Sequence, residues 1–166
     1  MAQKKINLDK IRTKIKLVVF DFDGVFTDNR VLTLQDGTEG VLCNRSDGFG
    51  IARLKDKNIQ YLVLSKERNP VVGARCQKLR IPCIQAVDDK LKIVRQEARK
   101  LGIGLEQVAY LGNDINDVEC LQNVGFSAAV ADSYPPVLKH AQYITKLPGG
   151  YGAVREFCDF LVGDKL

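Results

Sequence analysis

The sequence predicts an α/β fold in which helices cover both faces of a parallel sheet. Short apolar runs rich in β-branched residues alternate along the chain with longer segments of helical periodicity. The predicted strands are 17–20, 61–64, 82–87, 108–111 and 126–130. The predicted helices begin near Ser46 and then span 69–79, 88–100, 135–141 and 152–161. This alternation is typical of a Rossmann-like doubly wound sheet, and no linker interrupts it, so residues 1–166 are expected to form a single domain.

Two carboxylates follow the first predicted strand directly. Residues 17–20 are four consecutive apolar residues, Asp21 and Asp23 come next, and Gly24 allows the chain to turn away. In open α/β sheets, ligands bind beyond the carboxyl ends of the strands. Two carboxylates this close repel each other unless a cation or a proton lies between them. The pattern therefore predicts a binding site at this edge.

Other predicted strands also lead into polar residues. Ser65 ends the second strand, Lys90 opens the helix after the third, and Asp114 and Asp117 follow the fourth. In a doubly wound sheet these places converge on one pocket. Carboxylate oxygens of this kind suit Mg²⁺, which binds one or two carboxylates, waters and a substrate phosphate. A hydroxyl and an ammonium group beside them suit the phosphate itself.

A β-hairpin is predicted over residues 30–43. Two apolar runs, 30–34 and 40–43, flank a segment that contains Asp36-Gly37, a strong hairpin signal. A lone hairpin is only marginally stable in water. We therefore expect this hairpin to pack on another subunit.

Composition excludes several classes of protein. No apolar run approaches the ~20 residues of a membrane span, and residues 1–16 lack the apolar core of a secretory signal, so a cytoplasmic protein without a membrane partner is expected. The five cysteines show no metal or redox spacing and are expected to be reduced. The net charge is +5, but the basic residues are spread along the chain, which argues against a nucleic-acid partner and suits an anionic small molecule.

Four segments together resemble the ordered motifs of the haloacid dehalogenase superfamily of phosphotransferases. They are Asp-Phe-Asp-Gly-Val-Phe-Thr (21–27), Leu-Ser (64–65), Lys90 and Gly-Asn-Asp-Ile-Asn-Asp (112–117). No insertion large enough for a cap domain separates the first two motifs. The chain thus resembles the small capless class, which dephosphorylates 8- or 9-carbon sugar-acid phosphates (KDO 8-phosphate or KDN and N-acylneuraminate 9-phosphate). The tail 149–156 looks like the glycine-rich signature of that class, and the hairpin matches the element through which its members form homotetramers.

The resemblance implies hydrolysis of a phosphate monoester in two steps. Asp21 attacks phosphorus and forms an aspartyl-phosphate. Asp23 protonates the departing sugar oxygen and then deprotonates the water that cleaves the intermediate. The resemblance also implies that Mg²⁺ is held by Asp21, by the backbone carbonyl of Asp23 and by Asp114.

The remaining motif residues are expected to support this chemistry. Ser65 and Lys90 would bind the phosphoryl oxygens, as their counterparts in the superfamily do. Asp117 would orient Lys90 or a metal-bound water, and Asn113 would stand with it behind the metal ligands. Asp117 alternatively caps the helix that follows it.

Substrate choice depends on the second motif and the helix after it. The 8-carbon branch of the class usually continues this motif with Gly-Arg, whereas here it continues with Lys66 and Glu67. A glutamate at this place resembles the 9-carbon, sialic-acid-like branch. Arg75 and Lys78 match basic positions of that branch and are expected to face Glu67 or the sugar carboxylate. The prediction is a 9-carbon keto-sugar-acid 9-phosphate, with 3-deoxy-D-manno-octulosonate 8-phosphate as the alternative.

Two other classes of function remain open. Related domains fused to sugar-acid cytidylyltransferases serve as non-catalytic tetramerisation domains, some of them after losing catalytic carboxylates. A phosphorelay receiver domain also gathers acidic residues, a hydroxyl and a lysine around Mg²⁺, but its phosphorylated aspartate lies on the third strand. Here Asp21 and Asp23 lie at the end of the first.

Overall fold

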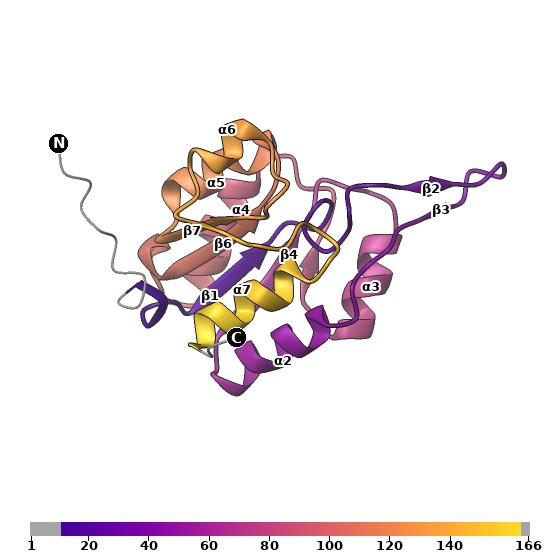
Figure 1. Cartoon of the computed structure of the whole chain (residues 1–166). Coiled ribbons are helices and arrows are strands. Elements are labelled where there is room, and N and C mark those ends of the chain that lie inside the picture. The colour runs from indigo at the N-terminus through magenta and orange to yellow at the C-terminus, as the bar shows by residue number, and fades with distance from the viewer. Residues whose placement is uncertain (1–10, 164–166) are drawn as a thin grey trace.

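Six parallel strands form the centre of the protein in the computed structural model, which describes residues 11–163 (Figure 1). Their order across the sheet is β5 (Cys83–Ile84), β4 (Gln60–Leu64), β1 (Leu17–Phe20), β6 (Val108–Gly112), β7 (Phe126–Ala129) and β8 (Tyr143–Ile144). Strand β1, which is buried along its whole length, pairs with β4 on one side and β6 on the other. The predicted doubly wound sheet is therefore confirmed, with the end of β1 at its middle.

The structure adds one strand and shortens another. Strand β8 was not predicted, because it has only two residues and is defined by its pairing with β7. The strand predicted over 82–87 ends at Ile84, and Ala86 adopts a left-handed backbone with φ of 56°. Because β-branched and alanine residues rarely adopt this conformation, the turn there is imposed by tertiary contacts.

Helices cover both faces of the sheet (Figure 1). On one face lie α2 (Asp47–Asp56), α3 (Val71–Leu79) and α7 (Ala153–Val162), and on the other lie α4 (Lys90–Lys100), α5 (Val118–Asn123) and α6 (Pro135–Leu138). The alternation of side chains along β1 serves both layers, since Val18 and Phe20 join the first core and Leu17 and Val19 the second. Helix α3 begins two residues later than predicted and ends at the predicted residue, Leu79.

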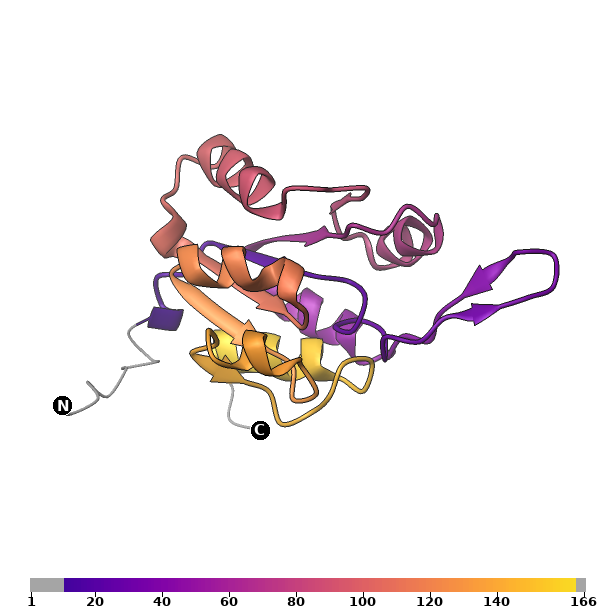
Figure 2. The same ribbon diagram turned by 90° about the horizontal axis from the view of Figure 1, so that it is seen from above.

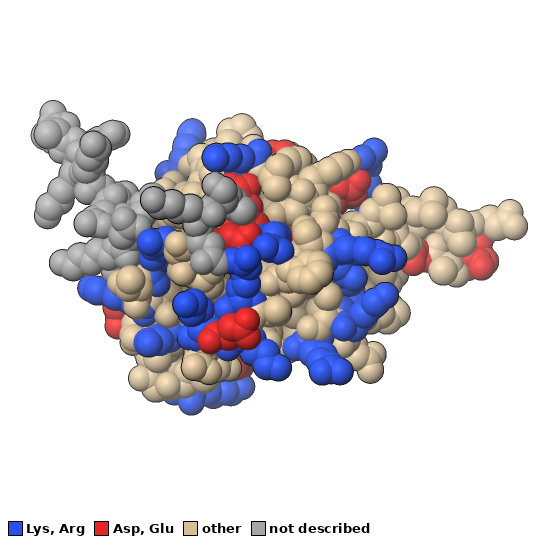
Figure 3. All heavy atoms as spheres, turned by 60° about the horizontal axis from the view of Figure 1, so that its bottom comes forward, with Lys and Arg blue, Asp and Glu red and all other residues tan. Residues whose placement is uncertain are grey.

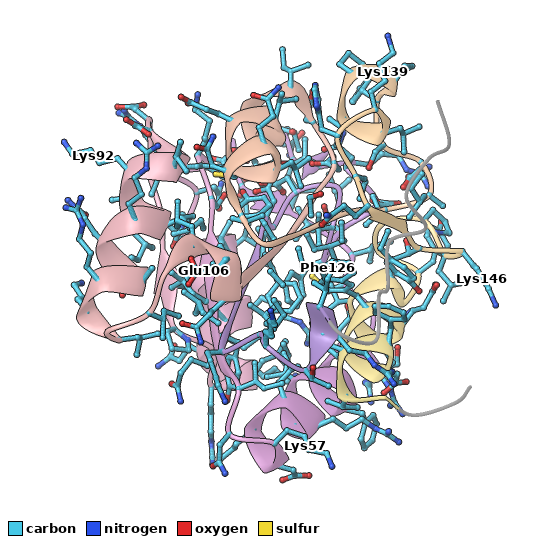
Figure 4. The ribbon with its side chains drawn as sticks, turned by 90° about the vertical axis from the view of Figure 1, so that its left-hand side faces the viewer. Lys57, Lys92, Glu106, Phe126, Lys139 and Lys146 are labelled. Carbon is cyan, nitrogen blue, oxygen red and sulfur yellow. The ribbon has the colours of Figure 1, made fainter. Side chains whose placement is uncertain are left out.

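An aromatic cluster fills the core between the sheet and α7. The rings of Phe126 and Phe157 stack with centroids 6.0 Å apart, and Phe20 meets Phe157 edge-on at 6.4 Å. Phe126, labelled in Figure 4, lies inside the molecule and is fully buried. Aromatic pairs of these geometries add to the stabilisation from burial alone.

An ion pair joins α2 to α7, and Figure 3 shows one face of the molecule with its charged side chains coloured. The buried carboxylate of Asp159 accepts from Arg155 Nε at 2.6 Å and lies 3.1 Å from Arg53 Nε. Other Lys and Arg side chains are spread over this face. Among residues 11–163 we find no helix with the length and hydrophobicity that crossing a bilayer requires.

The hairpin is present and projects from the body of the protein (Figures 1 and 2). It consists of β2 (Leu32–Thr33) and β3 (Glu39–Gly40), and an isolated bridge between Thr27 and Cys43 closes its base. Its apolar side chains are exposed, among them Leu32 at 65% and Leu42 at 78%. Between β1 and β4 the chain holds only this hairpin and α2, so no cap domain is inserted there.

Helix α2 opens with a buried carboxylate. Asp47 Oδ1 accepts from the Arg155 N–H at 3.4 Å, while Oδ2 has no hydrogen-bond partner within the described residues. Burial raises the pKa of Asp47 from 3.8 to about 7, against the opposing effects of the Arg155 N–H and the Arg75 charge. The folded protein therefore keeps a proton at Asp47 at pH values where the unfolded chain has lost it.

We expect Asp47→Asn to remove part of the pH dependence of stability. The folded-state pKa is raised, so the stability linked to Asp47 is fully present below about pH 4 and is lost as pH rises to about 7. The variant should therefore gain up to about 4 kcal/mol relative to wild type at pH 8. Urea unfolding at pH 4.5 and pH 8 measures this. Asp56→Asn, at the exposed end of the same helix, should keep the wild-type slope, and an unchanged slope in Asp47→Asn would contradict the prediction.

Candidate active site

The end of β1 places Asp21 at the edge of the sheet. Its N–H donates to the Leu111 carbonyl at 2.9 Å, which continues the pairing with β6 past the end of the strand. Its Oδ1 accepts from the Phe22 N–H at 2.7 Å. Gly24 then turns the chain with φ of 74°. Asp21 is 5% exposed and Asp23 is half-buried, so the first carboxylate is held by the sheet and the second stands nearer to solvent.

Lys90 joins two carboxylates below the surface. As the first residue of α4, it brings its Nζ to 2.8 Å from Asp21 Oδ1 and 2.7 Å from Asp117 Oδ1. The Tyr110 hydroxyl also donates to Asp117 Oδ1 at 2.7 Å. All of these side chains are buried. Buried charges are tolerated only when they are paired and hydrogen-bonded, so the three groups depend on one another.

Asp117 also organises the loop after β6. Its Oδ2 accepts from the N–H groups of Asn113 at 2.9 Å and Asp114 at 3.3 Å. Asp114 in turn caps the short helix η2 (Ile115–Asp117), and the two aspartates form a reciprocal capping box. Gly112 is required here, because a Cβ would lie 2.5 Å from Asp117 Oδ2. One carboxylate therefore ties the loop of residues 112–117 to Lys90.

A pocket of ≈ 380 Å³ opens above Asp21. It is lined by Asp21, Asp23, Ser65, Lys66, Glu67, Arg68 and Asn116. Ser65 is buried at the end of β4, and its Oγ accepts from the Glu67 N–H at 3.0 Å. Arg68 and Asn116 were not selected from the sequence, although each lies within three residues of a selected one. The sequence signals were that Asn116 lies inside the 112–117 motif and that Arg68 follows the Leu64-Ser65 motif closely.

Other candidate residues lie outside this pocket lining. Asp114 is half-buried in its capping interaction. Arg75 donates from Nη2 to the Asn44 carbonyl at 2.8 Å, and Lys78 is exposed on α3.

The Glu67 carboxylate turns back onto its own loop, where Oε1 accepts from the N–H groups of the next two residues at 2.6 and 2.8 Å. In the described part of the single chain, Glu67 forms no ion pair with Arg75 or Lys78.

The pocket carboxylates have raised proton affinity. Burial and the charge of Asp117 together raise the pKa of Asp21 to about 8, against the opposing effect of Lys90. Burial and the charge of Glu67 raise the pKa of Asp23, again opposed by Lys90. Negative charge at this edge thus exceeds what Lys90 alone offsets, and an added cation would stabilise both carboxylates in their ionised form.

The available donors fit a hard divalent cation. The Asp23 carbonyl accepts no hydrogen bond from the described residues, and the buried Oδ1 of Asn113 is left without a partner there. Residues 11–163 contain no group of three or more His, Cys, Asp or Glu side chains placed to hold a metal. A metal here would therefore use carboxylate, carbonyl and water oxygens, the mixed set that suits Mg²⁺.

The glycine-rich tail packs on the loop that carries Asp23. The Gly150 N–H donates to the Val25 carbonyl at 3.1 Å, and the Gly149 N–H donates to Asp132 Oδ1 at 2.9 Å. A Cβ at Gly149 would lie 1.9 Å from the Gly24 carbonyl oxygen, so only glycine allows the two backbones to approach. In the single chain, this segment therefore supports the loop of its own subunit that carries the candidate residues Asp21 and Asp23.

We expect Lys90→Met to destabilise the protein by about 3–5 kcal/mol, because Asp21 and Asp117 would stay buried without their cation. Urea unfolding in the presence of a chelator measures this. Lys92→Met is the matched control, since Lys92 points into solvent from the same helix (Figure 4). It should change stability by less than about 0.5 kcal/mol. Equal effects of the two substitutions would show that the buried ion pairs are unimportant.

The chain is similar to known hydrolases over most of its length. The family of haloacid dehalogenase-like hydrolases matches residues 75–154. The 3-deoxy-D-manno-octulosonate 8-phosphate phosphatase of Salmonella typhi is 37% identical over 149 residues, which cover 89% of this chain and 79% of that protein. The fold and the arrangement of motifs thus agree with sequence relatives of assigned activity.

Solved structures give the same result. The crystal structure of a HAD family hydrolase from Streptomyces avermitilis is 44% identical, with a TM-score of 0.88, and covers 92% of this chain and 87% of that one. The octulosonate 8-phosphate phosphatase of Moraxella catarrhalis, solved with magnesium, phosphate and KDO, is 31% identical with a TM-score of 0.91, covering 95% and 91% of the two chains. The chain therefore belongs to the haloacid dehalogenase-like hydrolases, in the capless family of the octulosonate 8-phosphate phosphatases, and is a phosphoric monoester hydrolase.

Proposed function

We propose that this protein is a Mg²⁺-dependent phosphatase of a keto-sugar-acid phosphate that works through an aspartyl-phosphate. The observation that carries the proposal is the difference in hydrogen bonding between the two carboxylate oxygens of Asp21. Its Oδ1 is held by Lys90 Nζ and the Phe22 N–H, while its Oδ2 accepts no hydrogen bond from the described residues and the side chain lines the pocket. One oxygen is thus fixed and the other is available as a nucleophile.

Asp21 Oδ2 attacks phosphorus, and the bond from phosphorus to the sugar oxygen breaks. Asp23 gives its proton to that oxygen, so the sugar acid leaves as an alcohol. Water then attacks the aspartyl-phosphate while Asp23 takes up its proton, which regenerates Asp21 and releases inorganic phosphate. The raised pKa of Asp23 suits this role, since it keeps a larger protonated fraction near neutrality.

Ser65 and Lys90 bind and orient the phosphoryl group. Ser65 Oγ accepts from the Glu67 N–H, which leaves its own proton for a phosphoryl oxygen. Lys90 offsets the charge that builds up around Asp21, and Asp117 holds Lys90 in place. Asp21, Asp114 and the Asp23 carbonyl would hold Mg²⁺, with Asn113 behind them. Bound Mg²⁺ would neutralise charge on the phosphate and the nucleophile.

The first substrate to expect is 3-deoxy-D-manno-octulosonate 8-phosphate, because the named relatives act on it. A 9-carbon acid 9-phosphate is the second candidate. Glu67 supports it, since this residue lines the pocket where the 8-carbon branch usually has arginine. Both substrates are consistent with the same chemistry, because each is a phosphate monoester of a keto-sugar acid.

We also propose that the protein is a cytoplasmic homotetramer. The hairpin exposes Leu34 at 50% and Leu42 at 78% on an element that contacts little else in its own chain. Four chains would cover this apolar surface and restrict water at the open pocket.

We expect Asp21→Asn to lower phosphate release by a factor of about 10³ or more, because an amide oxygen is a poor nucleophile. Chelation should abolish release by the wild type, and added Mg²⁺ should restore it. The assay uses octulosonate 8-phosphate, a 9-carbon acid 9-phosphate, a hexose phosphate and a nucleotide. Asp56→Asn, an exposed change of the same kind, should retain activity within about twofold.

The same assay distinguishes the two candidate substrates and the alternative functions of the protein. Preference for the 9-carbon acid would replace the first substrate by the second and keep the mechanism. Full activity in Asp21→Asn would exclude Asp21 as the nucleophile. No release from any substrate by folded, Mg²⁺-binding protein would favour a tetramerisation domain, and a long-lived phosphoprotein that releases no phosphate would favour a receiver domain.

Light scattering at micromolar concentration should give four times the chain mass of 18.5 kDa. Leu34→Asp combined with Leu42→Asp should yield smaller species, because charge on the hairpin would face an apolar partner surface. Leu101→Asp, at an exposed leucine beyond α4, should leave the mass unchanged. A fully active wild-type monomer would contradict the proposed assembly.

A further inference from the structure

Two cations in the pocket have no part in the proposed phosphate chemistry. Lys66 and Arg68 line the same pocket as Asp21 and Asp23, and both are exposed. Neither forms an ion pair or side-chain hydrogen bond with any residue in the range 11–163. Lys90 and Ser65, by contrast, are buried and bonded next to the nucleophile. The pocket therefore has a buried phosphate end and a second, exposed end with unpaired positive charge.

The loop that carries these cations is held by hydrogen bonds within the loop and by hydrogen bonds from Gln85 and Ala86. The Glu67 carboxylate accepts from the N–H groups of Arg68 at 2.6 Å and Asn69 at 2.8 Å. Gln85 Nε2 donates to the Asn69 carbonyl at 2.9 Å, and the Ala86 N–H donates to the Glu67 carbonyl at 3.2 Å. The strained, left-handed Ala86 is thus used to hold this loop. With Glu67 engaged by backbone N–H groups, its charge is not used to pair Arg68.

We propose that Lys66 and Arg68 recognise the carboxylate of the sugar acid, at the far end of the substrate from its phosphate. The inference rests on the proposed function, because it requires a substrate with two anionic groups. Asp23 and Glu67 would repel a substrate carboxylate that entered this pocket, and two unpaired cations on the same rim offset that repulsion. The arginine can bind a carboxylate through two parallel hydrogen bonds, which adds direction to the attraction.

This assignment differs from the prediction made from the sequence, in which Arg75 and Lys78 of α3 face Glu67 or the sugar carboxylate. Arg75 is engaged with the Asn44 carbonyl, and Lys78 is exposed outside the pocket lining. It also differs from general attraction of anions by surface charge, which would act on every phosphate ester and weaken with salt. Recognition of a carboxylate acts only on substrates that carry one.

The test compares two substrates that differ only in the carboxylate. One is the sugar-acid phosphate that the wild type hydrolyses best, and the other is the same phosphate with the carboxylate reduced to an alcohol. The measured quantity is the ratio of kcat/KM for the acid to kcat/KM for the alcohol, in wild type, Lys66→Ala, Arg68→Ala, Arg68→Lys and Lys78→Ala. Lys57→Ala is the matched control, because Lys57 is an exposed cation at the far end of α2 (Figure 4).

We expect Arg68→Ala to lower the ratio by about tenfold to a hundredfold, the range for losing a hydrogen bond to a charged group. Lys66→Ala should lower it less, Arg68→Lys should restore part of it, and Lys57→Ala should leave it unchanged. The change should appear mainly in KM for the acid, since the carboxylate is remote from the reacting bond.

An unchanged ratio in both Lys66→Ala and Arg68→Ala would overturn the inference. Equal losses on acid and alcohol would do the same and would assign the cations to general attraction. A fall in the ratio for Lys78→Ala alone would move the carboxylate site to α3. If the wild type releases phosphate from neither substrate, the proposed function itself fails, and that result is distinct from normal hydrolysis with an unaltered ratio.

Discussion

The paired contact of Lys90 with Asp21 and Asp117 is the interaction on which the site depends. The three residues come from the end of β1, the start of α4 and the loop after β6, so one buried ammonium joins three elements. Because none of these charges is stable alone in the interior, each position constrains the other two. Tyr110 and the N–H groups of the loop satisfy the remaining oxygens of Asp117. The same contact fixes one oxygen of Asp21, and the other accepts no hydrogen bond from the described residues.

The catalytic loop is supported from two sides. The sheet holds Asp21 through the Leu111 carbonyl, and the glycine-rich tail meets the other side through Gly149 and Gly150. Glu156 anchors the tail. Its buried carboxylate accepts hydrogen bonds from the N–H groups of Lys146 and Leu147 and from the Tyr143 hydroxyl. These contacts fix the backbone on both sides of Asp21 and Asp23, and a reacting group in the proposed mechanism needs such a fixed position.

The absence of a cap domain leaves the pocket open, which makes its rim important for selectivity. Among the described residues, the loop after β4 and Asn116 line the pocket together with Asp21 and Asp23. The charges of Lys66, Glu67 and Arg68 on that loop therefore lie at the pocket. The hairpin projects from the body and offers apolar surface, and Glu39 Oε2 in its strand β3 accepts a hydrogen bond from Asn69 Nδ2 in the loop after β4 at 2.9 Å.

Much of the site could be predicted from the sequence, because strand runs and the polar residues that end them are local signals. Asp21, Asp23, Ser65, Lys90 and the 112–117 loop were located in this way, together with the parallel sheet. Strand β8 could not be, since two residues become a strand only through their neighbour. The direction of Arg75 toward Asn44, the presence of Arg68 in the pocket and the contact of Gly149 with Gly24 likewise depend on segments far apart in the chain. Local sequence determines which residues end each strand, and only the folded backbone decides which side chains then meet.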